Sequence, residues 1–485
     1  MASPYLKADI FLIIIYIMKN IVSFIILFCA LGLQSCTETS IRLTDLRCEN
    51  LNNPIAIDNI APHFSWKLVS DESKRQVAYE IQVASDSLQL LQGNADLWNS
   101  GRIISDISVM LPYQGKELKS RGLYYWRVRV EDDRKEFSSW SPIQRFAVGI
   151  LEDKGDTLNG KFISLPGENV SSPLLRKSFL VENLGKAFLH VNSLGYHEAY
   201  LNGKKISSAV LSPSVSQLDK RSLIVTYDVT DYLKSGKNEL LLWLGKGWYK
   251  STTFKAEHNG PVVRAELDIL DGDGEWREQL VTDESWQACE SGYYDTGTWN
   301  ALRFGGEHID ARMLPSGLES DELDKLTGWT SAKEIVVNVR KASPQMSEQN
   351  KIQEVLSPKS ITALGDSTWL VDLGKVITGW FELHVPQLPS GHEIVASYSD
   401  YMKPDGTIEE QGEGDNYITS GNKGDVFCNK FHHHAFRYVK ISHLPQQPKN
   451  EDVKGYLIHG DYKHASSFVC SDSDLNEIHD MINYM

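Results

Sequence analysis

Apolar and polar residues alternate in short runs over most of the chain, and turn residues separate the runs. Between Ile41 and Val148, the runs Phe64–Leu68, Tyr79–Val83 and Tyr125–Val130 place apolar side chains on one face of an extended strand. Short strands spaced by polar turns are typical of a small antiparallel β-sandwich. Residues 41–148 are therefore predicted to form such a sandwich, with Trp66 in its core.

Two further β-rich units are predicted downstream. Residues 172–314 contain strands such as Phe188–Asn192 and a strong hairpin signal at Asn202-Gly203, and their Gly-rich connections favour a jelly roll. Residues 336–457 contain strands such as Gly379–Val385 and form the third unit. The expected fold class is mainly β, with tandem β-sandwich and jelly-roll domains.

Helical periodicity is found at the end of the chain, in residues 465–485. Ser471 is placed to cap this helix, with Asp474 three residues later. The apolar positions that recur at helical spacing are Leu475, Ile478, Ile482 and Met485. An apolar helix face needs something to pack against, and we expect further helices that this sequence does not contain. The alternative is an ordinary C-terminal helix docked on a sheet.

Composition narrows the classes of function. The 485 residues are enough for several domains, and a hydrophobic content of 41% permits real cores. The formal net charge of −15 argues against nucleic acid as a partner, because its phosphates would be repelled. An aromatic content of 10% suits β-sandwiches and surfaces that contact sugars.

Residues 1–36 are predicted to be a signal peptide. A short positive region at Met18–Asn20 precedes the apolar run Ile21–Leu33, which is short for a membrane span. The sequence Leu33-Gln34-Ser35-Cys36 then resembles the lipobox of bacterial lipoproteins, which implies lipidation of Cys36. We expect an exported lipoprotein, periplasmic or on the cell surface of a bacterium, with the membrane as partner through its lipid anchor. An ordinary cleaved signal peptide and a transmembrane anchor are the alternatives.

A series of motifs follows the predicted units in order. The second unit contains Tyr-Leu-Asn-Gly-Lys at 200–204, Thr-Tyr-Asp-Val-Thr at 226–230, Gly-Lys-Gly-Trp-Tyr at 245–249 and Gly-Gly-Glu-His-Ile-Asp-Ala-Arg at 305–312. The third contains Asp-Leu-Gly-Lys with a later Gly-Trp at 372–380, Asp-Asn-Tyr-Ile with a later Gly at 415–421, and Phe-Arg-Tyr-Val at 436–439. The final stretch reads Phe-Val-Cys-Ser-Asp-Ser-Asp-Leu-Asn-Glu-Ile at 468–478.

Together these motifs resemble bacterial α-L-rhamnosidases, glycoside hydrolase family 78. Residues 172–314 resemble the family's N-terminal β-domain, which is similar to carbohydrate-binding jelly rolls, and residues 336–457 its concanavalin-like β-sandwich. Residues 465–485 resemble the first helix of its (α/α)6 catalytic barrel. Residues 41–148 resemble a fibronectin type III-like module.

The resemblance implies an exported hydrolase that acts on terminal α-L-rhamnose of plant or microbial glycans with inversion. Inversion requires an acid and a base held about 6.5–9.5 Å apart, and in the family the barrel carries both. No Glu or Asp of this chain matches either, so no catalytic residue is predicted. We expect the accessory β-domains of such an enzyme, inactive alone, with the missing barrel as a partner. The alternatives are a stand-alone carbohydrate-binding lipoprotein and a structural multi-sandwich surface protein.

A sugar site is predicted in the second unit. Aromatic faces stack on a pyranose ring, while carboxylates and Arg fix hydroxyls. The candidates are Asn202, Trp248, Tyr249, Glu307, Asp310 and Arg312. Some members of the family bind rhamnose here with Ca²⁺, an ion that carboxylate and carbonyl oxygens suit. The alternative is that Trp248 is a core residue and that Asp310 and Arg312 form a structural ion pair.

Two polar clusters lie in the third unit. Glu409, Glu410 and Glu413 are expected either to form the rim of an active site or to be solvated. The tract at 432–434, His-His-His, resembles a metal site only superficially. In a strand, successive side chains point to opposite faces, so the three rings cannot meet one ion. No metal site is predicted.

Overall fold

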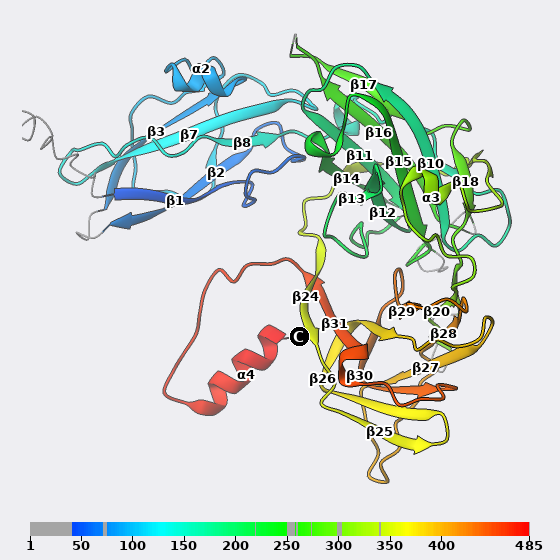
Figure 1. Cartoon of the computed structure of the whole chain (residues 1–485). Helices are drawn as coiled ribbons and strands as arrows, with labels where there is room; N and C mark the ends of the chain where they lie inside the picture. The colour runs from blue at the N-terminus through cyan, green and yellow to red at the C-terminus, as the bar shows by residue number, and fades with distance from the viewer. Residues whose placement is uncertain are drawn as a thin grey trace, which may run out of the picture. The chain divides into compact units, whose positions relative to one another are not determined.

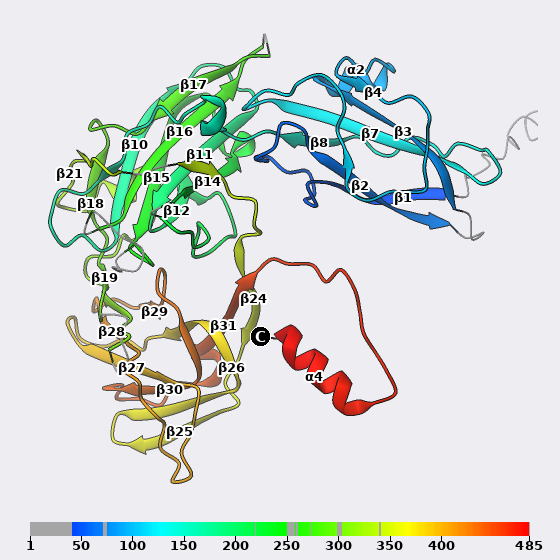
Figure 2. The ribbon, with the colours of Figure 1, turned by 180° about the vertical axis from the view of Figure 1, so that it is seen from behind.

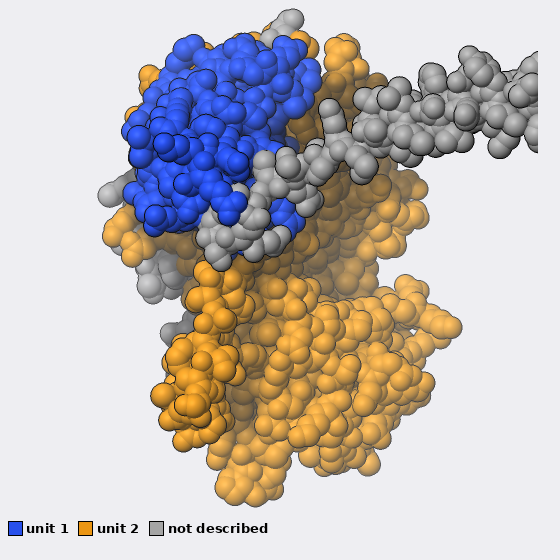
Figure 3. Space-filling view, turned by 90° about the vertical axis from the view of Figure 1, so that its left-hand side faces the viewer, with its two compact units in different colours: residues 1–53, 61–116, 124–145 blue, residues 54–60, 117–123, 146–485 orange. Residues whose placement is uncertain are grey.

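The computed structural model describes residues 41–70, 75–218, 220–249, 258, 260–272, 274–297, 303–338 and 341–484. The predicted signal peptide, including Cys36, lies outside the described residues. The chain divides into two compact units (Figure 3): unit 1 comprises residues up to 53, 61–116 and 124–145, and unit 2 comprises 54–60, 117–123 and the chain from 146 onward. No described helix is long and apolar enough to cross a membrane.

Unit 1 is built on two sheets (Figure 1). One sheet has the order β1 (Ile41–Cys48), β2 (His63–Ser70), β6 (Leu111–Pro112); the other has the order β4 (Trp98–Asn99), β3 (Gln76–Ala84), β7 (Leu123–Asp132), β8 (Gln144–Ala147), with β5 (Ile103–Ile104) also on β3. A short helix, α2 (Ser87–Leu91), follows β3. Trp66 is buried, with its ring centroid 5.5 Å from that of Tyr79, which confirms its predicted place in the core.

The first part of unit 2 has two sheets. One has the order β13 (Lys204–Lys205), β12 (Tyr196–Leu201), β15 (Gly236–Gly245), β10 (Pro173–Val181), β18 (Gln287–Glu290), β21 (Thr330–Ser331). The other has the order β22 (Lys333–Glu334), β9 (Ile163–Ser164), β16 (Val262–Leu270), β11 (Ala187–Leu194), β14 (Ser222–Asp228), β23 (Ala342–Pro344), with β17 (Trp276–Val281) also on β16. The short helical turns are η1 (Glu152–Lys154), η2 (Thr230–Tyr232) and α3 (Ser320–Leu323). We call these two sheets the jelly roll.

The predicted hairpin turn is confirmed. Leu201 pairs with Lys204, so Asn202 and Gly203 form a two-residue loop between β12 and β13. Their φ angles are 52° and 79°. Positive φ at both loop residues is what a tight hairpin of this twist requires, and Asn followed by Gly tolerates it best.

A large mixed sheet, here called the third sheet, completes the β-structure of unit 2 (Figure 2). Its order is β19 (Tyr293–Asp295), β20 (Glu307–Asp310), β28 (Gly414–Ile418), β27 (Glu393–Ser399), β30 (His434–Ser442), β26 (Thr368–His384), β31 (Val453–Gly460), β24 (Asn350–Leu356). Both β25 (Ser360–Gly365) and β29 (Val426–Cys428) also pair with β26, and η4 (Asn450–Asp452) precedes β31. Strands β19 and β20 come from within residues 172–314 but pair here rather than in the jelly roll.

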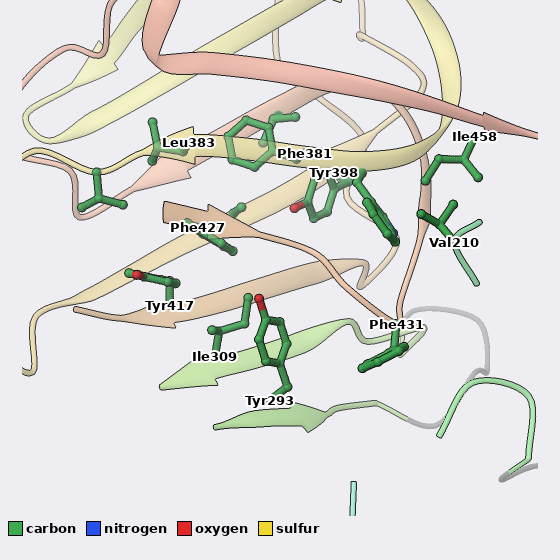
Figure 4. Packing of buried hydrophobic residues seen from close by; sticks show 14 of the residues in the cluster. Val210, Tyr293, Ile309, Phe381, Leu383, Tyr398, Tyr417, Phe427, Phe431 and Ile458 are labelled. Atoms are coloured by element: carbon green, nitrogen blue, oxygen red, sulfur yellow. The ribbon is translucent and has the colours of Figure 1, made fainter. Parts of the chain in front are cut away.

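One hydrophobic cluster spans the third sheet and the adjoining part of the jelly roll. Figure 4 shows Phe381 of β26, Tyr398 of β27 and Phe427 of β29 gathered together, and Phe431 on the loop that leads into β30. The cluster also contains Trp243 of β15, whose ring lies 6.5 Å from that of Phe431. The mainly β fold class is therefore confirmed, and the jelly roll and third sheet share a core.

The C-terminal helix α4 (Ser473–Tyr484) begins one residue after its cap. The cap is Asp472 and not Ser471, because the Oδ1 of Asp472 accepts hydrogen bonds from the N–H of Asp474 (2.9 Å) and Leu475 (3.2 Å). No residue of α4 is buried. Leu475 and Ile478 are 51% and 46% exposed, so the apolar stripe is largely open to solvent, and the helix meets the third sheet at Tyr484, whose hydroxyl donates to the carbonyl of Val376 (2.6 Å).

Candidate functional site

A buried carboxylate of the third sheet fixes the loop whose Phe431 packs against Trp243 of the jelly roll. Glu307 lies on β20, and its Oε1 and Oε2 accept hydrogen bonds from the backbone N–H of Phe431 and Lys430, each at 2.8 Å. The Nδ2 of Asn429 lies 3.5 Å from the same carboxylate. The loop before β30 is therefore fixed by the side chain of one strand, 124 residues earlier in the chain.

A second buried carboxylate, Asp415 of β28, lies beside Glu307. It accepts hydrogen bonds from the backbone N–H of Glu307 (2.6 Å), the Nδ2 of Asn429 (2.7 Å) and the hydroxyl of Tyr398 (2.5 Å). His434 bridges Asp415 (3.1 Å) and Glu413 (3.1 Å) with its two ring nitrogens. We call Glu307, Asp415, His434, Tyr398 and Asn429 the buried polar cluster.

Burial and neighbouring charge separate the pKa values within this cluster. Burial raises the pKa of Glu307 to about 7, and the charge of Asp415 adds to the rise, while the N–H donors of Phe431 and Lys430 oppose it. Burial would also raise the pKa of Asp415, but His434 outweighs it and holds that pKa at about 2. For His434, burial would lower the pKa, but Asp415 raises it to about 9. At neutral pH, His434 is therefore a buried cation paired with an ionised Asp415.

Glu198 forms a second link between the jelly roll and the third sheet. Its buried carboxylate on β12 lies 2.5 Å from the Nζ of Lys205 and 2.9 Å from the Nζ of Lys430, and it accepts a hydrogen bond from the hydroxyl of Tyr200. Burial would raise the pKa of Glu198, but Lys430 and Lys205 hold it at about 2. The Nζ of Lys430 also lies 4.2 Å above the ring of Trp243, a cation–π contact.

These two links are structural in their chemistry. The carboxylate oxygens of Glu307 and Asp415 accept hydrogen bonds from donors of the protein itself. A general acid or base must instead reach a substrate atom. The arrangement can hold a loop and two sheets in one geometry, and it presents no open pair of carboxyl groups to a sugar.

The six predicted sugar-site residues have separate environments. Asn202 is tied into its own turn region, because its Nδ2 donates to the carbonyl of Tyr232 (3.0 Å) and to the Oδ1 of Asn238 (2.9 Å). Trp248 and Tyr249 line a cavity of about 30 Å³. Such a volume holds one or two water molecules, not a pyranose ring. Glu307 belongs to the buried polar cluster.

Asp310 and Arg312 form an ion pair, as the alternative interpretation expected. The Nε and Nη2 of Arg312 lie 2.8 Å and 2.6 Å from the carboxylate of Asp310. This contact lowers the pKa of Asp310 despite its partial burial. The pair leaves the guanidinium exposed at the end of β20, where it is open to solvent.

Calcium does not fit the residues proposed for it. Glu307 and Asp310 direct their oxygens to N–H donors and to Arg312, so neither offers free oxygens to a cation. Over the described parts of the chain, no group of three or more His, Cys, Asp or Glu side chains is placed to hold a metal ion.

The acidic loop and the histidine tract have distinct surroundings. Glu409 and Glu410 are exposed, and Glu410 pairs with Lys440. Glu413 is half-buried and pairs with His434, so its role in a rim stays a prediction. In the tract, only His434 lies in a strand, as the first residue of β30, and the ring of His432 lies 4.8 Å from that of His434.

Sequence reasoning did not identify the buried polar cluster. In the sequence, Asp415 stands out only as the first residue of the motif at 415–421, and His434 only as part of a histidine tract. Their pairing joins β28 to β30, two strands that do not neighbour each other in the sheet. A single sequence carries no local signal for such a contact, although a His next to an apolar strand is a place to look for one.

Three family models match the chain in succession. Residues 43–152 match the Rha78A-like, N-terminal immunoglobulin domain. Residues 182–354 match the alpha-L-rhamnosidase N-terminal domain, and residues 362–459 match the bacterial alpha-L-rhamnosidase concanavalin-like domain. The first model describes an immunoglobulin domain, and a fibronectin type III-like module stays a prediction.

Curated relatives cover the same region. An alpha-L-rhamnosidase of Formosa agariphila is 31% identical over 513 residues, which is 95% of this chain and 53% of that protein. An alpha-L-rhamnosidase of Alteromonas sp. is 26% identical over 93% of this chain and 51% of its own length. The chain thus spans about half the length of the curated relatives it matches.

Solved structures agree with these matches. The alpha-L-rhamnosidase from Dictyoglumus thermophilum has a TM-score of 0.83 and 26% identity, covering 92% of this chain and 52% of that one. The Streptomyces avermitilis alpha-L-rhamnosidase complexed with L-rhamnose has a TM-score of 0.81 over 92% of this chain and 60% of that one. At 20% identity, this second likeness shows the fold alone.

Proposed function

Because the chain belongs to the bacterial α-L-rhamnosidase family, of which it contains the N-terminal domains, we propose that it supplies the accessory β-domains of an exported α-L-rhamnosidase. The substrate of that enzyme is terminal α-L-rhamnose in a plant or microbial glycan. The observation that carries this proposal is the order of the three family matches, which runs from residue 43 to residue 459. In this proposal the catalytic carboxyl groups of the enzyme lie in a helical barrel, which these β-domains support.

The geometry supports an accessory role in two ways. The jelly roll and the third sheet share a core, Glu198 pairs with Lys430 across them, and Glu307 fixes the loop that carries Lys430, so together they form one support. The exposed apolar face of α4 offers a docking surface for the helices of a barrel. A carbohydrate partner is also supported by the names of the relatives and by the L-rhamnose in the Streptomyces avermitilis structure.

A chimaera tests the accessory role. Residues 41–465 are joined to the helical barrel of the Dictyoglumus thermophilum relative, and hydrolysis of an aryl α-L-rhamnoside is compared with that of the barrel alone. We expect the chimaera to be active and the barrel alone to lose at least about tenfold in kcat/KM, because the barrel then lacks its support. Equal activity of the two proteins would contradict the proposal.

We also propose that Cys36 is lipidated and anchors the protein to a bacterial membrane. The lipobox-like sequence Leu33-Gln34-Ser35-Cys36 supports this. The test is fractionation of cells that express the whole chain. We expect the protein in the membrane fraction, and release of Cys36→Ala into the soluble fraction; a soluble wild-type protein would refute the anchor.

A further inference from the structure

Three large aliphatic side chains are exposed close together in unit 1. Ile104, Ile107 and Val109 are 77%, 58% and 61% exposed and lie within six residues of one another. We call them the apolar edge. Single exposed aliphatic residues are ordinary on a protein surface, but a contiguous group marks an interaction site.

The backbone of the apolar edge is fixed, so the exposure does not come from a loose segment. The buried Gln76 donates from its Nε2 to the carbonyls of Ser105 (3.1 Å) and Ile107 (2.8 Å). Its Oε1 accepts a hydrogen bond from the indole N–H of Trp66 (3.0 Å), and the N–H of Trp66 donates to the carbonyl of Ser108. Hydrogen bonds from Trp66 and from the side-chain amide of Gln76 thus fix the backbone that carries these exposed apolar side chains.

The apolar edge lies at the end of the sandwich where the described chain begins. Ile41, the first residue of β1, pairs with Ser70 at the end of β2. Gln76 begins the next strand, and Ile104 pairs with Ala78 two residues later. Figure 1 shows the start of β1 and the start of β3 at this same end, while α2 follows the other end of β3.

We propose that the apolar edge contacts the lipid surface to which Cys36 is anchored. This inference rests on the proposed lipidation of Cys36. Only residues 37–40 separate Cys36 from Ile41, and five residue steps span at most about 18 Å. The anchor therefore holds this end of unit 1 near the membrane, where apolar side chains gain by entering the boundary between headgroups and acyl chains.

The charges at this end indicate which kind of contact to expect. Basic and acidic side chains are mixed among the described residues there, because the Gln76–Asp132 pairing and the bonds of Gln76 to Ser105 and Ile107 bring these segments together: Arg75, Arg134 and Lys135 with Asp106, Asp133 and Glu136. A mixed surface has no net attraction for anionic lipid. The contact is therefore apolar, and raising the salt concentration leaves it unchanged.

A fluorescent probe tests the contact in the anchored protein. Ile107→Cys is combined with Cys428→Ser and Cys470→Ser and labelled with nitrobenzoxadiazole, because the two remaining described cysteines, Cys48 and Cys289, are buried. The protein, expressed with residues 1–36, is reconstituted in phosphatidylethanolamine–phosphatidylglycerol vesicles. Leu91→Cys in the same background is the control, since Leu91 on α2 is 67% exposed at the opposite end of β3. The readout is emission wavelength and quenching by nitroxide-labelled lipid.

We expect the probe at position 107 to emit at shorter wavelength and to be quenched at least about twofold more than the probe at position 91, at low and high salt alike. Membrane binding is checked by flotation of the protein with the vesicles. Equal quenching at the two positions in protein that floats overturns this inference, while the lipid anchor at Cys36 remains supported. Shielding of position 107 without quenching by lipid also overturns it, because that result indicates a protein partner. Protein that fails to float refutes the anchor itself, and the inference with it.

Discussion

The Nζ of Lys430 lies 2.9 Å from the Oε2 of Glu198, and the pair joins strand β12 of the jelly roll to the loop that precedes β30. The two residues are 232 positions apart in the sequence. The carboxylate is almost wholly removed from solvent, so its charge depends on the two lysines that surround it. This contact and the hydrogen bonds of Glu307 to the same loop explain why unit 2 behaves as one body.

Lys430→Met should destabilise unit 2. The substitution keeps most of the apolar stem but removes one of two cations beside a buried carboxylate. A buried charge that loses its whole partner costs about 3–5 kcal/mol. Because Lys205 and Tyr200 remain, we expect a loss of about 2 kcal/mol in the free energy of unfolding, measured by denaturant titration at pH 7.

Lys440→Met, which breaks the more exposed pair with Glu410, is the matched control and should cost at most about 1 kcal/mol. Equal losses in the two variants would contradict the expectation that the buried Lys430–Glu198 pair stabilises the protein more than the exposed Lys440–Glu410 pair.

Glu307→Gln should change the pH dependence of stability. The pKa of Glu307 is raised from 4.5 to about 7 in the folded protein. A raised pKa gives stability that is fully present below pH 4.5 and is lost as the pH rises through 7, because the folded state binds the extra proton. Gln cannot titrate, so the free energy of unfolding of the wild type should fall relative to the variant between pH 4.5 and 7.

Unfolding titrations at several pH values check this. The difference between the two curves removes the contributions of other titrating groups. Curves that stay parallel from pH 4.5 to 8 would mean that Glu307 remains ionised throughout this range, and that its two N–H donors outweigh its burial.

His434→Gln should be strongly destabilising. The change removes the buried cation between Asp415 and Glu413 and leaves Asp415 without a charge partner. We expect a loss of about 3–5 kcal/mol at pH 7. His433→Gln, one residue earlier, is the control. Burial, and then the charge of His434, lower the pKa of His433 to about 4, so no cation is lost there. A loss at His433 as large as that at His434 would contradict the assigned pairing.

The apolar face of α4 should contribute little to the stability of this chain. Ile478 is half exposed and packs in no core, so Ile478→Ala should change the free energy of unfolding by no more than about 0.5 kcal/mol. Ile441→Ala, in the core of the third sheet, should cost about 2–5 kcal/mol. Thermal or denaturant unfolding of both variants distinguishes an unpartnered face from a docked helix, for which the two losses would be similar.

Local patterns predicted local structure well. The hairpin at Asn202-Gly203, the strand at Phe188–Asn192 and the helix near the end of the chain follow from turn chemistry and periodicity that neighbouring residues carry. The helix cap was misplaced by one residue, because Ser471 and Asp472 both have capping side chains and only geometry chooses between them.

Long-range relationships could not be predicted in the same way. Strands β19 and β20 lie within residues 172–314, the predicted second unit, yet they pair in the third sheet, with β20 parallel to β28. Glu307 was predicted to contact a sugar because carboxylates can fix sugar hydroxyls. Its side chain is instead turned toward the loop at Lys430 and Phe431, a contact that depends on the fold of the whole unit.

The central proposal is that the β-domains of residues 41–460 support a sugar-cleaving enzyme and do not themselves carry its reacting carboxyl groups. The most direct test incubates the purified 485-residue protein with an aryl α-L-rhamnoside and follows release of the aryl alcohol, with the Dictyoglumus thermophilum enzyme as positive control. We predict no release above the buffer rate. Turnover by this protein that disappears when one of its own Asp or Glu side chains is neutralised would contradict the account.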